Sequence, residues 1–307
     1  SGATLCILPN GSHFIGDTLA SYLENKKISV VLLTGGILQT LPQRSLESLK
    51  TIVMGGEGCS QDAINYWSKD RSFINAYGLT ETAVCVTMHE AMPGSQPNVI
   101  GKPTYNNRVY VLGKNRELLP IGAVGELCIG GISLARSYMN DAQLTQEKFM
   151  NDFDLFDTRL FKSGDLVKWL PDGNLFFIGR RDNQVKIRGF RVELDEIANV
   201  IKQIQGVDQC VVLVSTDQFQ HKIIVAYVKF SKEQSELSTE YIKEYLKGTL
   251  ASYMLPSIFI EVSAIPLTAN GKVDKRFLLN HYLHLEPSKP TSSESLEGAI
   301  SHVWKQL

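Results

Sequence analysis

The sequence Thr51-Ile-Val-Met-Gly-Gly56 decides the fold class of the first part of the chain. It is a short apolar run closed by two glycines, a pattern typical of a buried strand that ends in a tight turn. Residues 28–33, followed by Gly35-Gly36, repeat this pattern. Helical patterns lie beside the two runs, at residues 15–23 and 62–67. Alternating strands and helices predict an α/β layer.

The pattern changes to β at residue 108 and to a small mixed unit after Asp182. The β-rich part contains predicted strands at residues 108–112 and 126–129 and a hairpin at 166–179. The later unit combines predicted strands with helical spacing, and its length of about 100 residues is enough to fold alone. Its predicted elements are strands at 184–188, 210–214, 223–230 and 258–262 and helices at 197–204 and 239–250.

These patterns predict an α/β protein with a large first part followed by a small α+β unit. The expected parts are residues 1–182 for the large part and 183–284 for the small unit, then a linker at 285–293 and the start of a further helix at 294–307. The linker expectation rests on its Pro, Ser and Thr content. The length of 307 residues agrees with about two domains.

Composition excludes several classes of protein. The net charge of −1 provides no field that would hold nucleic acid or an anionic membrane. No apolar run reaches the roughly 18 residues of a membrane span, and the N-terminus lacks the pattern of a signal peptide. Five cysteines without a CxxC pair indicate neither a disulfide framework nor a zinc site. We therefore expect a cytoplasmic protein without nucleic-acid or membrane partners.

The stretch Asn75-Ala-Tyr-Gly-Leu-Thr-Glu81 brings a ring, a glycine turn, a hydroxyl and a carboxylate together. These groups suit a nucleotide with Mg²⁺, because the ring offers a face to a base and the carboxylate binds the metal. The alternative is a strand-to-helix turn capped by Thr80. Taken alone, the stretch favours the alternative, because such short matches occur often by chance.

Three further stretches carry groups that could act on the same ligand. Asp165, after Lys162-Ser-Gly, could accept hydrogen bonds from ribose hydroxyls or form an Asx-turn. The cationic stretch 179–189 could bind phosphate and form a hinge, or be a solvated strand face. Lys272, beside the turn signal Asn270-Gly271, could stabilise a developing negative charge or be a surface lysine.

Five stretches, in this order, resemble the motifs of the adenylation domains of nonribosomal peptide synthetases, which are adenylate-forming enzymes. They are residues 75–81, like N-x-Y-G-P-T-E; 125–140, like G-E-L-x-I-x-G-x-x-[LV]-A-R-G-Y; 161–166, like Y-[RK]-T-G-D-L; 179–196, like G-R-x-D-x-Q-V-K-I-R-G-x-R-[IV]-E-L-x-E-I; and 266–275, like P-L-T-x-N-G-K-V-D-[RK]. The resemblance runs from near the first residue to about residue 284. It implies that residues 1–182 are part of a large α/β core that includes a small β-barrel-like region, and that residues 183–284 form a small mobile α+β lid. The closing helix looks like the first helix of a carrier-protein domain.

The resemblance implies a binding site for ATP. Tyr77 is expected to stack on the adenine, and Asp165 to take the ribose hydroxyls. Arg180 is expected to lie close to the ribose and the phosphate. The whole set expected around the nucleotide is Gly56, Glu57, Gly58, Asn75, Tyr77, Asp165 and Arg180.

The resemblance also implies three catalytic residues. Thr80 is expected to touch the phosphate, and Glu81 to help hold Mg²⁺. Lys272 is expected to contact the substrate carboxylate and the α-phosphate during adenylation. Leu79 stands where the family has proline, and we expect this change to loosen the turn. Serine replaces threonine at Ser163, a mild change.

A second reaction is implied as well, in which a carrier-protein phosphopantetheine thiol accepts the acyl group. Asp182 is the expected hinge, and the loop with Lys186 and Gly189 is expected to shape the tunnel for the thiol. The family's phosphate loop, and the helix whose Asp grips the substrate amine, belong upstream of residue 1. We therefore expect the chain alone to bind ATP weakly and not to turn over, and we expect that upstream part and a downstream carrier domain as its partners.

The expected substrate is an amino acid with an apolar side chain. By alignment, the pocket contains only apolar or small residues, and a buried polar group without a partner costs free energy. They are Leu32, Val53, Gly55, Ala76, Val84 and Cys85. An α-keto or aryl acid stays open as the substrate. A stand-alone acyl- or aryl-CoA ligase and a degenerate, non-catalytic docking domain are the alternative functions.

Overall fold

The computed structural model describes residues 2–8, 14–152, 158–181, 184–187, 189–217, 222–231, 238–268 and 272–282. The chain divides into two compact units, Ser1–Asp195 with Asp217–Lys222 and Glu196–Thr216 with Ile223–Leu307. Asp182, the predicted linker and the predicted closing helix lie outside the described residues. The predicted domain boundary at residue 182 therefore stays a prediction.

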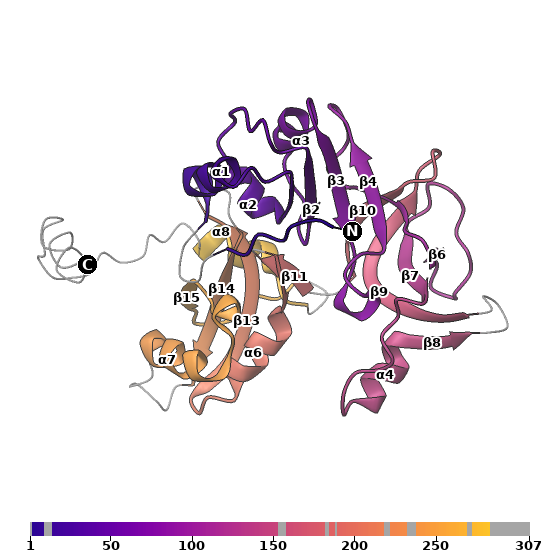
Figure 1. Cartoon of the computed structure of the whole chain (residues 1–307). Helices are drawn as coiled ribbons and strands as arrows, with labels where there is room; N and C mark the ends of the chain where they lie inside the picture. The colour runs from indigo at the N-terminus through magenta and orange to yellow at the C-terminus, as the bar shows by residue number, and fades with distance from the viewer. Residues whose placement is uncertain are drawn as a thin grey trace, which may run out of the picture. The chain divides into compact units, whose positions relative to one another are not determined.

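The first unit is built on a ten-stranded mixed sheet (Figure 1). Hydrogen bonds join the strands in the order β1-β2-β3-β4-β5-β10-β9-β7-β6, and β8 pairs with β9. β1, β2 and β3 are parallel, whereas the other pairs of this sheet are antiparallel. Its strands are β1 (Val30–Leu33), β2 (Thr51–Gly55), β3 (Ser72–Tyr77), β4 (Thr87–Ala91), β5 (Val99–Pro103), β6 (Asn107–Leu112), β7 (Gly125–Gly131), β8 (Phe149–Asp152), β9 (Thr158–Trp169) and β10 (Leu175–Arg180).

Three short helices pack against the parallel part of this sheet, namely α1 (Gly16–Asn25), α2 (Gly35–Thr40) and α3 (Gln61–Trp67). The hydroxyls of Thr34 and Ser60 cap α2 and α3 by accepting bonds from backbone N–H groups. The α/β prediction is confirmed here. The core between helices and strands includes Leu19, Leu38, Ile52, Met54, Trp67 and Phe73.

The predicted β-rich region is the antiparallel part of the same sheet. The hairpin predicted at 166–179 is confirmed as β9 and β10, and its turn is closed by Leu170 N–H donating to the Asn174 carbonyl at 2.8 Å. Gly173 has φ +79° in this turn, a conformation that favours glycine. Among the described residues, the remaining helical segments of this part are α4 (Ala142–Lys148) and the 3₁₀ turn η1 (Thr80–Thr82).

A separate two-stranded hairpin ends the first unit. We call residues 184–193, which comprise β11 (Gln184–Ile187) and β12 (Phe190–Glu193), the β11–β12 hairpin. Gln184 lies opposite Glu193, and Ile187 lies opposite Phe190. Both strands are grouped with the first unit, although the sequence predicted them in the small domain.

The second unit is a three-stranded sheet with helices, as the sequence predicted. Strand β14 lies between β13 and β15, and β14 pairs with β15 in parallel. Its core contains Leu213, Val225, Tyr227, Val262 and Leu278. The elements are α6 (Leu194–Lys202), which begins at the boundary, β13 (Val207–Thr216), β14 (Lys222–Phe230), α7 (Thr239–Thr249), η2 (Ser252–Met254), β15 (Ile258–Glu261) and α8 (Lys275–Tyr282). Within the described part of the chain, no helix combines the length and apolarity needed to span a membrane.

Candidate functional site

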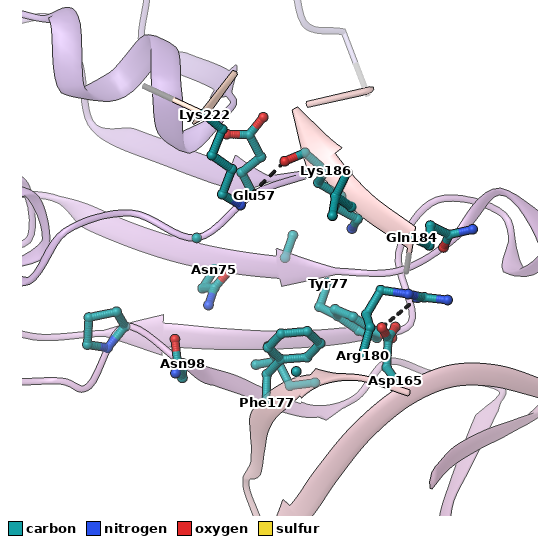
Figure 2. A pocket seen from close by; sticks show the side chains of 17 residues that line it. Glu57, Asn75, Tyr77, Asn98, Asp165, Phe177, Arg180, Gln184, Lys186 and Lys222 are labelled. Carbon is teal, nitrogen blue, oxygen red and sulfur yellow. Dashed lines mark hydrogen bonds and ion pairs between the residues drawn. The ribbon is translucent and has the colours of Figure 1, made fainter. Parts of the chain in front are cut away.

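A cavity of about 390 Å³ opens in the first unit, and Figure 2 shows the side chains around it. Its wall combines ends of sheet strands, the glycine-rich loop after β2 and the β11–β12 hairpin. The lining residues are Gly56, Glu57, Gly58, Asn75, Ala76, Tyr77, Pro97, Asn98, Ile100, Asp165, Phe177, Gly179, Arg180, Gln184, Val185, Lys186 and Lys222. All seven residues expected around a nucleotide line this one cavity.

Tyr77, Asp165 and Arg180 form a hydrogen-bonded group on one side of the cavity. The Tyr77 hydroxyl donates to Oδ2 of Asp165, and Nη1 of Arg180 donates to Oδ1 at 2.6 Å. Arg180 Nη2 also donates to the Ser163 carbonyl at 3.1 Å, which fixes the guanidinium. The Asp165 side chain is 4% exposed and that of Arg180 is 12% exposed, so this ion pair is nearly withdrawn from water.

Burial governs the ionisation of this group. It raises the pKa of Asp165 above its ordinary value, although Arg180 and the Tyr77 hydroxyl act in the opposite direction. Burial also raises the pKa of Tyr77 well above its usual range, and the Asp165 carboxylate adds to this shift. Tyr77 therefore stays a neutral hydrogen-bond donor beside the carboxylate.

A loop and the β11–β12 hairpin supply the other side of the cavity. The backbone N–H of Gly189 donates to Oε1 of Glu57, and Nζ of Lys186 lies 5.7 Å from the centroid of the Tyr77 ring. Lys222 Nζ donates to the Lys186 carbonyl at 3.4 Å, as the dashed line in Figure 2 shows. Burial lowers the pKa of Lys186, while Asp165 raises it. A cation thus lies over the ring expected to stack on adenine.

Glu81 lies in a second, smaller group of interactions and does not line the cavity. Its Oε1 accepts from the Tyr138 hydroxyl at 2.6 Å, and both of its oxygens accept from Nη1 of Arg191. Burial raises the pKa of Glu81, but the bond from Tyr138 and the charge of Arg191 outweigh it, so the pKa lies below its ordinary value. Glu81 is therefore an anion held by a cation.

Although Leu79 is expected to loosen the turn that carries Thr80 and Glu81, two hydrogen bonds between Leu79 and Thr82 close it. The N–H of Leu79 donates to Oγ1 of Thr82 at 3.3 Å, and this hydroxyl returns a bond to the Leu79 carbonyl at 3.1 Å. Proline has no N–H and could not make the first bond. The Leu79 side chain is buried in the core, and Thr80 is exposed.

Glycine is required at the start of the same turn. A Cβ on Gly78 would lie 2.1 Å from the Val84 carbonyl oxygen, which is too close for any side chain. Val84 itself has φ +76°, a strained conformation for a β-branched residue.

The residues expected to contact the substrate side chain are spread over several elements. Among them, Ala76 lines the cavity, while the others do not. Leu32 lies opposite Val53, and Gly55 lies opposite Ala76, so β1, β2 and β3 contribute neighbouring positions. Leu32 is 68% exposed and Val84 77% exposed. Burial raises the pKa of the partly buried Cys85 thiol.

Lys272 belongs to the second unit and is exposed. Its backbone closes a turn with Thr268, whose N–H donates to the Lys272 carbonyl at 2.6 Å. The turn signal Asn270-Gly271 lies outside the described residues. The expected hinge residue Asp182 does so as well.

Several cavity residues and contacts were not predicted from the sequence. Phe177 lies 6.4 Å from Tyr77 between ring centroids, and its N–H donates to the Asn98 carbonyl at 2.8 Å. Neither residue belongs to a chemically distinctive pattern, so only the pairing of β5 with β10 reveals them. The bond from Tyr138 to Glu81 was missed for a different reason: both residues stand in quoted motifs, but 57 residues separate them and only the fold brings them together.

A magnesium ion fits this site if substrate phosphates and water supply most of its ligands. The described residues contain no group of three or more His, Cys, Asp or Glu side chains that could hold a metal by themselves. Mg²⁺ is often bound by one or two carboxylates together with substrate phosphates and water. Glu81 and the exposed Thr80 hydroxyl match this pattern, provided that Arg191 leaves the carboxylate.

Comparison with known families gives two matches. Residues 1–139 match the AMP-binding enzyme family, and residues 196–272 match the AMP-binding enzyme C-terminal domain. Bacitracin synthase 3 of Bacillus licheniformis is 44% identical over 309 residues, and tyrocidine synthase 1 of Brevibacillus parabrevis is 36% identical over 315. Both alignments include all of this chain, which spans only 5% and 28% of those proteins.

Solved structures agree with these matches. PA1221, a nonribosomal peptide synthetase protein with adenylation and PCP domains, superposes with a TM-score of 0.76 at 24% identity, covering 85% of this chain and 46% of that one. AB3403, a four-domain synthetase bound to AMP and glycine, is 35% identical with a TM-score of 0.51, covering 92% and 21%. The matches to residues 1–139 and 196–272 together take in most of the chain, which therefore belongs to the AMP-binding enzyme family and is similar to parts of nonribosomal peptide synthetases.

Proposed function

We propose that this chain binds ATP and takes part in activating an amino acid as its aminoacyl-AMP, followed by transfer to a carrier-protein phosphopantetheine thiol. The observation that carries the proposal is the single cavity lined by Tyr77, Asp165, Arg180 and the glycine-rich loop at residues 56–58. These residues come from four separate stretches of sequence. Because they line the same cavity, we expect them to bind the same ligand.

The cavity supports binding of the adenosine part of ATP. The Tyr77 ring offers a face for the base, and the loop at residues 56–58 lies across the cavity. An ionised carboxylate has about four acceptor positions, and Tyr77 and Arg180 use two of those on Asp165. The remaining acceptor positions suit two ribose hydroxyls.

In the first reaction we assign contact with the phosphate to Thr80 and binding of Mg²⁺ to Glu81. We assign stabilisation of the developing negative charge to Lys272. An oxygen of the substrate carboxylate attacks the α-phosphorus, and the bond to pyrophosphate breaks. Mg²⁺ would neutralise phosphate charge when bound at Glu81. The Lys272 amine would supply a positive charge to the carboxylate and the α-phosphate as negative charge develops.

In the second reaction the carrier thiol attacks the acyl carbon, and AMP leaves. We assign the hinge to Asp182 and the thiol tunnel to the loop of Lys186 and Gly189, with residues 1–182 as core and 183–284 as lid. Lys186 already lines the cavity, which supports a role for this loop at the site. Cytoplasmic location and the upstream and carrier-domain partners belong to the same proposal.

We assign an apolar side chain to the substrate. The six residues expected around it carry no polar group other than the Cys85 thiol. This thiol stays neutral at neutral pH, because burial raises its pKa. A charged substrate side chain would lose its hydration without gaining a partner. Leucine-like or aromatic amino acids are therefore preferred over polar ones.

The test is ATP–pyrophosphate exchange over a panel of amino and keto acids. The assay uses the longest polypeptide that contains these 307 residues, and the chain alone is run beside it. We expect exchange with a few apolar acids and a loss of at least ~100-fold in Lys272→Ala, the ~2.7 kcal/mol of one transition-state contact. Lys247→Ala, an exposed lysine of the same unit, is the control. The proposal would be overturned if Lys272→Ala left the exchange rate of the longest polypeptide unchanged, or if that polypeptide showed no exchange with any acid.

A further inference from the structure

Glu126 lies on strand β7 and does not line the candidate cavity, yet it contacts two neighbours of the cavity's ion pair. Its Oε1 accepts from the backbone N–H of Gly164 at 3.1 Å, and its Oε2 accepts from Nη1 of Arg181, also at 3.1 Å. These two partners stand next in sequence to Asp165 and Arg180. One carboxylate, only 14% exposed, therefore joins β9 to the end of β10 where the expected ribose site lies.

Strand β9 bulges at the residues that carry this site. Residues 162 and 166 of β9 pair with residues 128 and 126 of β7, so that three residues of β9 lie opposite one of β7. Gly164, in the middle of the bulge, has φ +75°, a left-handed conformation that favours glycine. Bulges often lie beside active sites, where they change the direction in which a side chain points. The direction of the Asp165 side chain therefore depends on the groups that hold this bulge.

Hydrogen bonds from both neighbouring strands hold the bulge. The Ser163 hydroxyl donates to a backbone carbonyl of β7 at 2.7 Å, and its oxygen accepts the Asp165 N–H at 3.0 Å. The Arg181 N–H donates to the Gly164 carbonyl at 2.9 Å. The Glu126 carboxylate accepts the N–H of the same glycine. A change at Glu126 therefore acts directly on the residue that precedes Asp165.

Of the two bonds that Glu126 accepts, the one from Gly164 should matter more. The Gly164 N–H is part-buried, and a backbone donor without a partner costs free energy there. The Arg181 side chain is 62% exposed, and ion pairs of exposed side chains are weakened by water and salt. We therefore expect the acceptor oxygen of Glu126 to count for more than its charge.

We propose that Glu126 is a positioning residue for the ribose of the nucleotide. By accepting the Gly164 N–H, it holds the bulge that directs the Asp165 carboxylate into the cavity (Figure 2). This inference rests on the proposed function and adds a residue outside the cavity to it. The acceptor positions of Asp165 that Tyr77 and Arg180 leave open then face the ribose hydroxyls. Recognition of these hydroxyls, and not stability alone, depends on Glu126.

The test compares the affinities of AMP and 2′-deoxy-AMP by calorimetry, in the longest polypeptide that contains these 307 residues. The two ligands differ by one ribose hydroxyl, so the ratio of their dissociation constants reports its recognition. We expect wild type to prefer AMP by about tenfold or more, as for a hydrogen bond to a charged group, and Glu126→Met to prefer it by about threefold or less. Methionine keeps the approximate size of Glu126 but offers no comparable acceptor. Unfolded protein in a preparation lowers the stoichiometry of both ligands and leaves the ratio unchanged.

Two further variants separate the acceptor of Glu126 from its charge. Glu126→Gln keeps an acceptor for Gly164 and loses the charge that faces Arg181. It should retain the preference for AMP within about twofold of wild type, and Arg181→Gln should do the same. Glu117→Met is the matched control and should leave the ratio unchanged. Glu117 is exposed, and its carboxylate also accepts a backbone N–H, that of Asn115 at 2.9 Å.

Two results would overturn the inference. If Glu126→Met kept the wild-type preference for AMP while its unfolding free energy fell, Glu126 would have a structural role only. If Glu126→Gln lost the preference as fully as Glu126→Met, the charge and not the bond from Gly164 would determine the site. The proposed function fails separately, namely if wild type does not bind AMP or binds both nucleotides equally, and the inference then fails with it.

Discussion

The candidate binding residues and the candidate catalytic lysine are held in very different ways. Tyr77 and Asp165 lie on strands of one large sheet, are nearly buried and are joined by a hydrogen bond. Lys272 is an exposed residue of the second unit, held by one backbone bond from the Thr268 N–H and by a bond from its own N–H to Oγ1 of Thr268. The first arrangement fixes the geometry of its side chains, whereas an exposed turn of this kind suits a side chain that enters and leaves a site. Substitutions should therefore separate stability from turnover.

Asp165→Ala tests the rigid side of this comparison and has the largest expected effect. It leaves the buried guanidinium of Arg180 and the Tyr77 hydroxyl without their acceptor. We expect the free energy of unfolding to fall by about 3 to 5 kcal/mol, the range for breaking a buried ion pair from one side. Chemical denaturation followed by tryptophan fluorescence measures this, because Trp67 and Trp169 lie in the first unit.

Asp165→Asn is the matched control, since it keeps the size and one acceptor oxygen. It should cost clearly less than Asp165→Ala. Equal losses would mean that packing, and not the hydrogen-bonded group, holds this wall of the cavity.

Lys272→Ala tests the other half of the comparison, the exposed lysine of the second unit. Its expected loss of exchange corresponds to ~2.7 kcal/mol of transition-state stabilisation, whereas the unfolding free energy should change by less than about 0.5 kcal/mol, as for other exposed residues. AMP binding should be unchanged as well. A large drop in stability would show that the lysine has a structural role, and the contrast drawn above would fail.

Leu79→Pro places the proline of the family motif into this particular turn. Leu79 has φ −132°, far from the −65° that proline requires, and its N–H bonds to Thr82. We expect a loss of about 1 to 2 kcal/mol in the unfolding free energy, larger than the gain proline gives at compatible positions. Leu79→Val, which keeps the N–H, is the control. A stabilised proline variant would show that the turn adapts to either residue.

The sequence predicted local helices and strands, and the chemistry of single stretches, better than it predicted the contacts between them. Residues 51–56 and 166–179 have clear periodicity and turn residues, and both predicted elements formed. β4 was missed, because its sequence Thr-Met-His-Glu-Ala mixes polar and apolar residues on a half-exposed strand. Tyr77 and Asp165 could be named separately, but their hydrogen bond depends on sheet order.

The contact of Arg191 with Glu81 shows the same limit more sharply. Both residues stand in motifs that the sequence analysis quoted. Periodicity reports which face of a strand is buried, not which distant segment lies against it. Strand pairings and loop positions decide such pairs, and only the three-dimensional structure supplies them.

Tyr77→Phe has the smallest expected effect. Within the rigid region, it separates the contribution of the Tyr77 hydroxyl from that of the ring. The ring stays, so its face remains available to a base, and the hydroxyl bond to Asp165 is lost. We expect a loss of about 1 kcal/mol in the unfolding free energy, the net worth of one hydrogen bond, because Arg180 still satisfies the carboxylate. AMP affinity should fall by less than about threefold, whereas Tyr77→Leu, which removes the ring, should lose about tenfold or more, as base stacking on an aromatic ring is worth ~1–3 kcal/mol. If Tyr77→Phe and Tyr77→Leu weaken AMP equally, the hydroxyl and not the ring face recognises the nucleotide, and adenine would need another partner in this cavity.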